Sequence, residues 1–245
     1  MACQSPDCKT HQEIVGFKYP LPHFRAALKS RRKVKVVAIG SSSTAGADKV
    51  LPFPPRLEMM LRQNFYSKMI YGSMIDVVNR GIGGQEAPEE LSRFESDVIA
   101  EAPALVIWQV GTNAVYRNKD YNPDEVAAAI SVGLSWLATL PMDVVLMDLQ
   151  YTKALIEKIG DSDVVKLPLS EDMVSRIAAA AENSQPEVNV FRRFALMQRW
   201  VDAGISLDNL DDGYPEHLHT SKWATNCVAQ ALSEAIVNAP VGASS

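Results

Sequence analysis

The sequence predicts one α/β domain in which a parallel β-sheet is covered by helices on both faces. Three observations support this fold class. Apolar segments rich in β-formers alternate with segments of helical periodicity from residue 33 to the C-terminal region. One apolar segment, ALVIWQVG at 104–111, has almost no polar residue, as expected of a strand covered on both faces. The length of 245 residues suits a single domain with a core of normal size.

The elements are expected to follow one another in order along the chain. Strands are predicted at 33–40, 74–80, 104–111, 143–150 and 188–191. Helices are predicted at 55–65, 88–100, 122–140, 170–184, 192–203 and 221–237. Asn122 as N-cap and Pro123 at the first helical position mark the start of one helix, and Ser170 marks the start of the next. Residues 1–32 are predicted to be a polar N-terminal arm and residues 33–240 a single domain.

Charge and hydropathy exclude several classes of protein. A net charge of −5 argues against a nucleic-acid-binding surface, which needs a basic footprint. The longest uncharged stretch, 126–142, contains Pro141 and several small residues, so a buried helix and a turn are expected there instead of a membrane span. The N-terminus lacks the apolar core of a signal peptide, which favours a cytoplasmic location and leaves export of a longer precursor open.

Cysteine and histidine usage indicates neither a disulfide scaffold nor a metal site. The three cysteines are too few for a disulfide framework. Cys3 and Cys8 lie in the same polar tail and could pair with each other, whereas Cys227 falls in an apolar helical pattern and is predicted to be a core thiol. No set of cysteines has zinc-like spacing, so no zinc site is expected.

The segment GSSSTAG, from Gly40 to Gly46, follows the first predicted strand. Ligands of parallel sheets bind at the carboxyl ends of the strands, so this loop is a candidate site. A phosphate-binding loop is excluded because no lysine follows Gly46 until Lys49, and the glycine pattern of a dinucleotide site is absent. A serine at a sharp strand-to-helix turn can present its hydroxyl as a nucleophile, and the alternative is a polar turn.

Other predicted loops at the same edge also carry polar groups. The loop NRGIGGQ after the second strand has glycines that let a ligand approach the backbone. Asn113 follows the third strand, where its amide can donate to a developing oxyanion. In EHLH, Glu216 precedes His219 by three residues, a spacing that lets a carboxylate orient an imidazole base. His217 is the alternative base.

These four segments, in this order, resemble the conserved blocks of the SGNH (GDSL-type) hydrolase family of serine esterases. GSSST at 40–44 resembles the first block, with serines at 41 and 43 where the family usually has aspartate and an aliphatic residue. The resemblance places the nucleophile at Ser42, the oxyanion glycine at Gly84, the oxyanion amide at Asn113 and the base at His219. Glu216 takes the place of the usual aspartate of the last block. Asp211 and Asp212 are alternative orienting acids.

The resemblance also implies a fold and an activity. It implies a three-layer, flavodoxin-like sandwich with a five-stranded parallel sheet, and hydrolysis of short acyl esters, with acetyl groups on carbohydrate favoured. It also implies a mechanism that needs no metal and no organic cofactor. The backbone N–H groups of Ser42 and Gly84 would complete the oxyanion hole with Asn113. Tyr116, Tyr151 and the loop 151–169 are candidate pocket walls. A homo-oligomer is expected from the apolar segment 154–159 and the N-terminal arm. An O-acyltransferase and a catalytically silent glycan-binding module are the alternatives.

Overall fold

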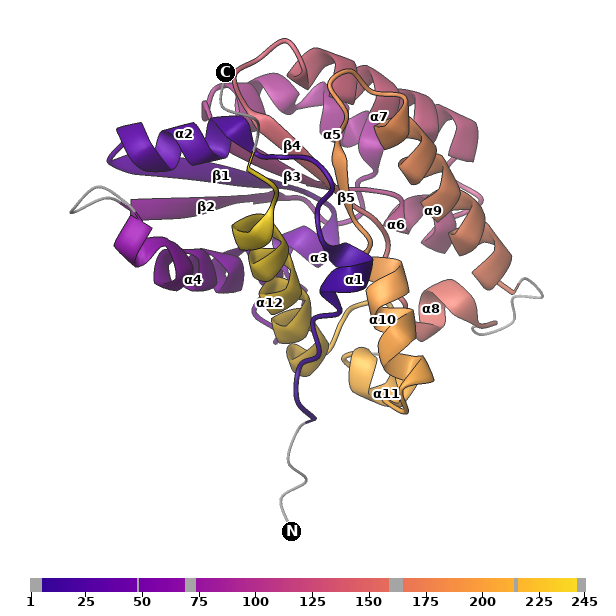
Figure 1. Ribbon diagram of the computed structural model, residues 1–245. Helices are drawn as coiled ribbons and strands as arrows, with labels where there is room; N and C mark the ends of the chain where they lie inside the picture. Colours follow the sequence, from indigo (N-terminus) through magenta and orange to yellow (C-terminus); the bar gives the residue numbers. More distant parts are fainter. Residues whose placement is uncertain (1–5, 48, 69–73, 159–164, 214–215, 242–245) are drawn as a thin grey trace.

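The β-sheet of the computed structural model has the strand order β2-β1-β3-β4-β5 in the described residues, and each neighbouring pair is parallel (Figure 1). The structure describes residues 6–47, 49–68, 74–158, 165–213 and 216–241. The strands are β1 (Lys33–Gly40), β2 (Met74–Gly81), β3 (Leu105–Gln109), β4 (Asp143–Met147) and β5 (Asn189–Phe191). This order is that of a flavodoxin-like sheet, so the predicted α/β fold class is confirmed.

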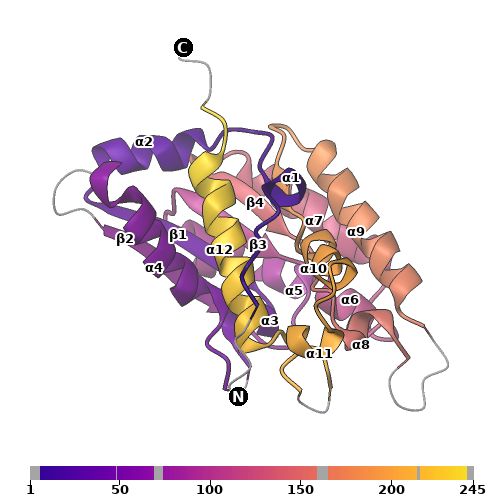
Figure 2. The same cartoon turned by 60° about the horizontal axis from the view of Figure 1, so that its bottom comes forward.

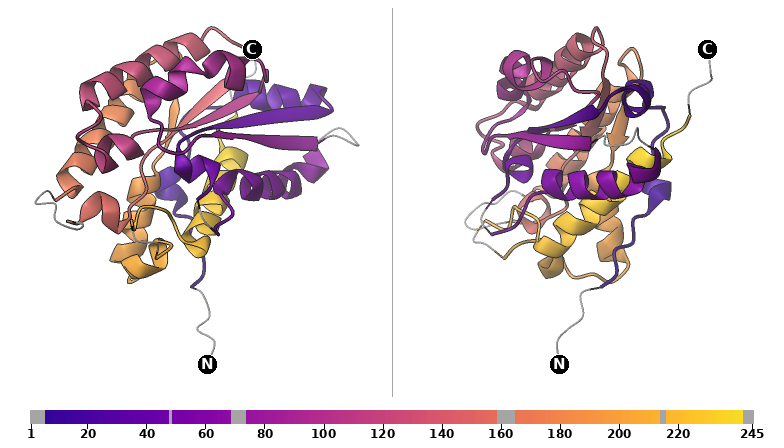
Figure 3. Two further views of the ribbon diagram at one scale, coloured as in Figure 1. Left: turned by 180° about the vertical axis from the view of Figure 1, so that it is seen from behind. Right: turned by 90° about the vertical axis from the view of Figure 1, so that its left-hand side faces the viewer.

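Helices cover both faces of the sheet and form the outer layers of the sandwich (Figures 1 and 3). One face is covered by α2 (Pro22–Ser30), α4 (Phe53–Phe65), α10 (Arg193–Asp202) and α12 (Lys222–Asn238). The other face is covered by α5 (Ala87–Ser92), the π-helical turn η2 (Glu95–Ile99), α7 (Pro123–Leu137) and α9 (Leu167–Glu182). The side chains of β1 alternate between the two cores: Val36 and Ala38 lie in one, Val37 and Ile39 in the other.

Short helices gather at the edge where the strands end, as Figure 2 shows for α3, α6, α8 and α11. They are α3 (Ser42–Ala45), α6 (Thr112–Tyr116), α8 (Lys153–Ile156) and α11 (Leu207–Leu210). The remaining helical segments are α1 (Gln12–Val15) and the 3-10 turn η1 (Tyr66–Lys68). Helices α3, α6 and α8 follow β1, β3 and β4, so the loops chosen from the sequence do occupy one edge.

The start of α9 differs from the prediction that Ser170 marks the start of this helix. The helix begins at Leu167, and Pro168 in its first turn supplies a fixed backbone torsion that suits a helix start. Ser170 is instead fully buried, and its hydroxyl donates to the carbonyl of Leu155 at 2.6 Å. Ser170 therefore joins α9 to α8. By contrast, Asn122 caps α7 as predicted, with its side chain accepting from the backbone N–H of Asp124.

The described part of the N-terminal arm packs onto the sandwich. Val15, Leu21 and Phe24 are buried in the same core as α12 and α4. Asp143 accepts from the backbone N–H of Phe24 at 2.8 Å, which fixes the start of α2 against β4. The segment thus makes its described contacts within its own chain, while the boundary at residue 32 and the homo-oligomer remain predictions. Across the described ranges, no helix combines the length and the apolar character needed to cross a bilayer.

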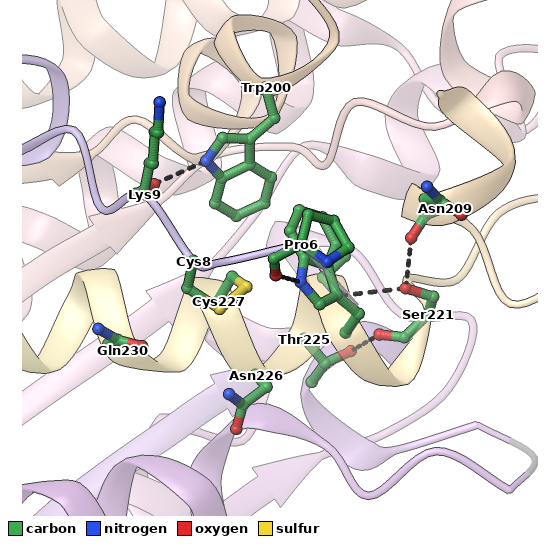
Figure 4. Close-up of a disulfide and its surroundings, with 12 residues drawn as sticks. Pro6, Cys8, Lys9, Trp200, Asn209, Ser221, Thr225, Asn226, Cys227 and Gln230 are labelled. Carbon is green, nitrogen blue, oxygen red and sulfur yellow. Dashed lines mark hydrogen bonds between the residues drawn. A yellow bond between two sulfur atoms is a disulfide. The ribbon is translucent and has the colours of Figure 1, made fainter. Parts of the chain in front are cut away.

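The cysteine prediction is wrong in one respect, because Cys8 and Cys227 form a disulfide (Figure 4). Their Cα atoms lie 5.2 Å apart although 219 residues separate them in sequence. Cys227 is buried in α12 as expected, but as a half-cystine instead of a core thiol. Cys3, which the sequence analysis suggested as a partner for Cys8, lies outside the described residues. Disulfides persist in oxidising compartments, so this bond weighs against the cytoplasmic location, which stays a prediction.

The disulfide fastens the N-terminal strap, residues 6–10, across α10 and α12 (Figure 4). The indole N–H of Trp200 in α10 donates to the carbonyl of Lys9 at 2.7 Å, and that of Trp223 in α12 donates to Pro6 at 2.7 Å. The two indole rings pack 5.3 Å apart between centroids. Because α12 begins three residues after His219, the strap is tied to the helix that follows the last loop of the candidate site.

Replacing Cys8 and Cys227 together by serine is expected to lower the free energy of unfolding by about 3–5 kcal/mol, since the bond closes a very long loop in the unfolded chain. Urea unfolding of the oxidised protein measures the effect. Cys3→Ser is the matched control and is expected to leave the midpoint unchanged. Free thiol on both Cys8 and Cys227 in the natively purified protein, or equal midpoints for the double variant and the wild type, would contradict the bond.

Candidate active site

Ser42 lies at the first position of α3, directly after the end of β1. Gly40 ends the strand, and the chain turns through Ser41, whose backbone N–H and hydroxyl both donate to the side-chain carbonyl of Gln109. Gly81 at the end of β2 makes room for this turn, because a Cβ atom there would lie 2.1 Å from the backbone nitrogen of Ala45. The strand-to-helix turn therefore depends on the neighbouring strand, and it leaves Ser42 half-buried at the sheet edge.

The structure brings Ser42 and His219 together. Ser42 Oγ and His219 Nε2 lie 2.9 Å apart although 177 residues separate them in sequence. His219 is half-buried, and its other ring nitrogen, Nδ1, is buried without a hydrogen-bond partner in the described part of the chain. A serine hydroxyl beside an imidazole is the arrangement that activates a nucleophile, and Nδ1 then needs an acceptor to fix the tautomer.

The second and third candidate loops are joined by Glu86, which sequence reasoning did not single out as functional. Its carboxylate accepts from the backbone N–H groups of Gly111 at 2.7 Å and Ala114 at 3.0 Å. It also caps α5 in a capping box with Glu89. The amide of Asn113 donates to the carbonyl of Gln85 at 2.7 Å, which is a second link between the same two loops.

Burial raises the pKa of Glu86, while the backbone N–H groups that it accepts from oppose the shift. The neighbouring carboxyl of Glu90 is also fully buried, and desolvation together with the nearby Glu86 holds its pKa well above its usual range. Glu90 accepts from the indole N–H of Trp108 at 2.7 Å. Glu86 thus joins α5 to the third candidate loop, and Glu90 joins α5 to β3.

Gly84, the candidate oxyanion glycine, follows a residue that lies close to Ser42. A Cβ atom at Gly83 would lie 3.8 Å from the Cβ atom of Ser42, so this loop runs alongside the serine. Gly84 follows with a φ of 82°, in the left-handed region that favours glycine. Its carbonyl accepts from the hydroxyl of Tyr121 at 3.0 Å. Asn113, on α6, is buried with only 2% of its surface exposed.

The acidic residues of the last loop fall into different environments. Glu216 is exposed and forms no hydrogen bond with His219 in the described structure. Asp211 is buried and lies 3.2 Å from Nδ1 of His217, the alternative base, and it accepts from the backbone N–H of Gly213. Asp211 is thereby engaged with the other histidine of the pair.

Asp212 lies directly across a short hairpin from His219. An antiparallel bridge joins Asp211 to Thr220, and the backbone N–H of Asp212 donates to the carbonyl of His219 at 3.1 Å. Residues directly opposite each other in such a pair share one face, and adjacent residues face opposite ways. Asp212 and His219 therefore share a face of the hairpin, and Asp211 lies on the other face.

The two tyrosines predicted to wall the pocket lie in different surroundings. Tyr116 lines a cavity of about 360 Å³ together with Arg117, Ala154 and Lys166. The ammonium of Lys166 is held by the carbonyls at the end of α6. Tyr151 instead packs edge-on against Phe194, with ring centroids 5.0 Å apart, and is half-buried. Residues 159–164 of the loop 151–169 lie outside the described residues.

A family model described as the non-GDSL lipase-like family matches residues 7–240. The chain belongs to this family. Among curated proteins no match is found. Within the described residues there is no cluster of three or more His, Cys, Asp or Glu side chains suited to hold a metal ion.

Solved structures similar to this non-GDSL lipase-like protein share its fold. Axe2, an acetylxylan esterase from Geobacillus stearothermophilus, has a TM-score of 0.65 at 21% identity, covering 83% of this chain and 94% of that chain. LAE5, described as an α/β hydrolase enzyme from the metagenome of Lake Arreo, Spain, has a TM-score of 0.64 at 18% identity, covering 85% of this chain and 97% of that chain. At these identities the similarity establishes the fold alone.

Proposed function

We propose that this protein is a serine esterase that removes short acyl groups, acetyl above all, from carbohydrate esters through an acyl-serine intermediate. The observation that carries the proposal is the 2.9 Å approach of Ser42 Oγ to His219 Nε2 at the carboxyl edge of the sheet. The acetylxylan esterase named above has the same fold, and variants of it in which a serine, an aspartate or a histidine becomes alanine are described as catalytic mutants. The blocks that resemble the SGNH family support the same assignment.

In this mechanism His219 accepts the proton of Ser42 as its oxygen attacks the ester carbonyl. The tetrahedral intermediate collapses when the imidazolium returns the proton to the leaving alcohol, and an acyl-serine remains. Water then attacks the acyl-serine and gives one proton to His219. The second tetrahedral intermediate collapses as the imidazolium returns that proton to Ser42 Oγ, which releases the carboxylic acid and regenerates both residues. Every proton transfer in this sequence passes through the imidazole of His219.

Three donors are proposed to meet the oxyanion: the backbone N–H groups of Ser42 and Gly84 and the amide of Asn113. The first N–H groups of a helix have no acceptor within the helix, so Ser42 at the start of α3 has a donor to offer. The amide of Asn113 carries two N–H donors, and one is used by the carbonyl of Gln85. That bond fixes the plane of the amide, which leaves its second donor for a substrate.

The orienting acid is proposed to be Asp212, which the hairpin places across from His219. In the acetylxylan esterase the aspartate lies three positions before the histidine, a spacing that here falls on the exposed Glu216. The bridge between Asp211 and Thr220 and the backbone bond from Asp212 to His219 favour Asp212 over Glu216. No carboxylate contacts Nδ1 in the described structure, and such contacts commonly tighten only when substrate binds.

The test of the proposed function is hydrolysis of p-nitrophenyl acetate, butyrate and octanoate, followed by acetylated xylo-oligosaccharides. We expect kcat/KM to fall as the acyl chain lengthens. Quenching a reaction and digesting the protein is expected to yield a peptide from 33–46 with an added acyl mass on Ser42. Binding of the oligosaccharide with no turnover of any ester would instead indicate the silent module. Transfer of acetyl to an added sugar in preference to water would indicate the acyltransferase.

Asn113→Ala is expected to lower kcat by about 10²–10³-fold, the usual cost of losing one oxyanion donor, with KM little changed. Steady-state kinetics on p-nitrophenyl acetate measure the effect. Asn183→Ala, at the C-terminal end of α9, is the matched control because it changes an exposed asparagine outside the proposed oxyanion hole. An equal loss in both variants, or a rise in KM at constant kcat for Asn113→Ala, would remove Asn113 from the oxyanion hole.

A further inference from the structure

Gln150 is a fully buried amide that contacts several separate segments beneath the site. It lies three residues beyond the end of β4 and has no exposed surface. Its carbonyl oxygen accepts from Arg193 Nη2 at 2.8 Å, from Thr112 Oγ1 at 3.1 Å and from Ser43 Oγ at 3.3 Å. Its amide nitrogen donates to the backbone carbonyl of Leu218 at 3.0 Å.

Three of these partners are the immediate neighbours of proposed site residues. Ser43 follows the proposed nucleophile, Thr112 precedes the proposed oxyanion amide, and Leu218 precedes the proposed base. The loops that carry them come from three distant parts of the sequence. One side chain thus connects the positions on which nucleophile, oxyanion donor and base depend.

The chemistry of its partners fixes the orientation of the Gln150 amide. Arg193 can only donate, so the atom that faces it must be the carbonyl oxygen. Thr112 Oγ1 accepts from the amide of Gln109 at 3.1 Å, which leaves its own proton for Gln150. The amide nitrogen of Gln150 is therefore directed at the carbonyl of Leu218. Thr152 donates to the same carbonyl at 3.1 Å, so two buried side chains hold the residue before His219.

Arg193 supplies a buried positive charge behind this amide. Only 3% of its surface is exposed, and burial lowers the pKa of its guanidinium to about 10. It lies at the start of α10, close to Asp148, which follows β4 and whose pKa burial raises to about 7. A charged donor strengthens a hydrogen bond and restricts its geometry. Arg193 thus fixes the side chain of Gln150, which in turn contacts the three loops that carry the proposed site residues.

We propose that Gln150 is a positioning residue that sets the distance between Ser42 Oγ and His219 Nε2. The proposal rests on the proposed function, because it assigns the pair as the reacting groups. Gln150 does not touch substrate in this scheme. It acts through the backbone of Leu218 and the hydroxyls of Ser43 and Thr112. Losing its four hydrogen bonds lets the loops of serine and histidine move independently.

Gln150→Met tests the proposal, since methionine has a similar length and shape but neither donor nor acceptor of comparable strength. We expect kcat on p-nitrophenyl acetate to fall by about 10²-fold with KM within twofold, because a displacement of about 1 Å at reacting groups has this cost. The rate at which diethyl p-nitrophenyl phosphate labels Ser42 is expected to fall in parallel. Ser170→Ala is the matched control: it removes another buried side-chain bond to a backbone carbonyl, that of Leu155, and is expected to lower the melting temperature without lowering kcat.

Gln150→Glu covers the case in which the methionine variant does not fold. It keeps an acceptor for Arg193, Thr112 and Ser43 but presents an oxygen to the carbonyl of Leu218, so kcat is again expected to fall at constant KM. Folded variants at Gln150 whose kcat and labelling rate stay within threefold of wild type would overturn the proposal. The failure of the proposed function looks different: wild type would then show no labelling of Ser42 at all.

Discussion

Ser42→Ala is expected to reduce kcat for p-nitrophenyl acetate by about 10⁴–10⁶-fold, with KM nearly unchanged, because the variant lacks the oxygen that forms the acyl-enzyme. The residue left behind is small, and Ser42 is only half-buried, so the fold is expected to be retained. His219→Ala is expected to have a loss of similar size. The two groups act as one unit 2.9 Å apart, so the double variant is expected to be no slower than either single variant.

Ser43→Ala is the matched control for Ser42→Ala. Both serines lie in α3, and Ser43 contacts Gln150 through one long hydrogen bond of 3.3 Å. We expect Ser43→Ala to lower kcat by about tenfold or less. Activity is measured with enzyme purified on unused resin, so that traces of wild type do not set the floor. Activity of Ser42→Ala close to that of wild type would exclude the acyl-serine mechanism, whatever the histidine variants do.

The sheet could be predicted from the sequence because its strands are marked locally. In β3, Trp108 and its neighbours are buried on both faces of the sheet, and the run of apolar residues predicts this burial. The helix boundaries were less certain where local signals compete. Ser170 resembles an N-cap, but Pro168 begins the helix earlier and a bond to Leu155 draws the serine inside. Tertiary contact decided that case against local preference.

The disulfide shows a second limit of local patterns. Cys227 lies on the apolar face of α12 and behaves in sequence like any core residue. Its partner Cys8 lies 219 positions away in a polar tail, and no spacing rule connects the two. Trp200 and Trp223 donate hydrogen bonds to the same strap, and no sequence pattern predicts these contacts either. Only the fold places the tail over α10 and α12.

The geometry of the candidate site was predictable where the family blocks name a residue, and less so for the residues that support it, while the roles of these residues stay proposals. Ser42 and His219 were expected to meet, and they lie within hydrogen-bond distance. Glu86 and Gln150 were not expected, because their partners lie on other loops: Glu86 binds the backbone after β3, and Gln150 binds the carbonyl before His219. Such contacts carry no signature in a single sequence. The available signal is a Glu or Gln that lies beside a family block or directly after a predicted strand.

Asp212→Asn is expected to lower kcat by about 10³–10⁴-fold with KM little changed, the cost of an amide that stabilises the wrong imidazole tautomer. The expectation follows from the hairpin, in which Asp212 and His219 lie opposite each other, and from the burial of His219 Nδ1. An asparagine preserves size and backbone pairing, so thermal melting is expected to change little. Steady-state kinetics on p-nitrophenyl acetate measure the effect.

Glu216→Gln is the decisive companion, because the spacing of the last block favours Glu216 while the hairpin favours Asp212. Glu216 is exposed, and its carboxylate would have to lose hydration to approach the half-buried His219. We therefore expect Glu216→Gln to retain activity within about threefold. If Glu216→Gln loses activity and Asp212→Asn keeps it, the loop rearranges around substrate and the block spacing is the better guide. Asp211→Asn separates the remaining case, because Asp211 binds His217 on the opposite face, and a dominant effect there would make His217 the base.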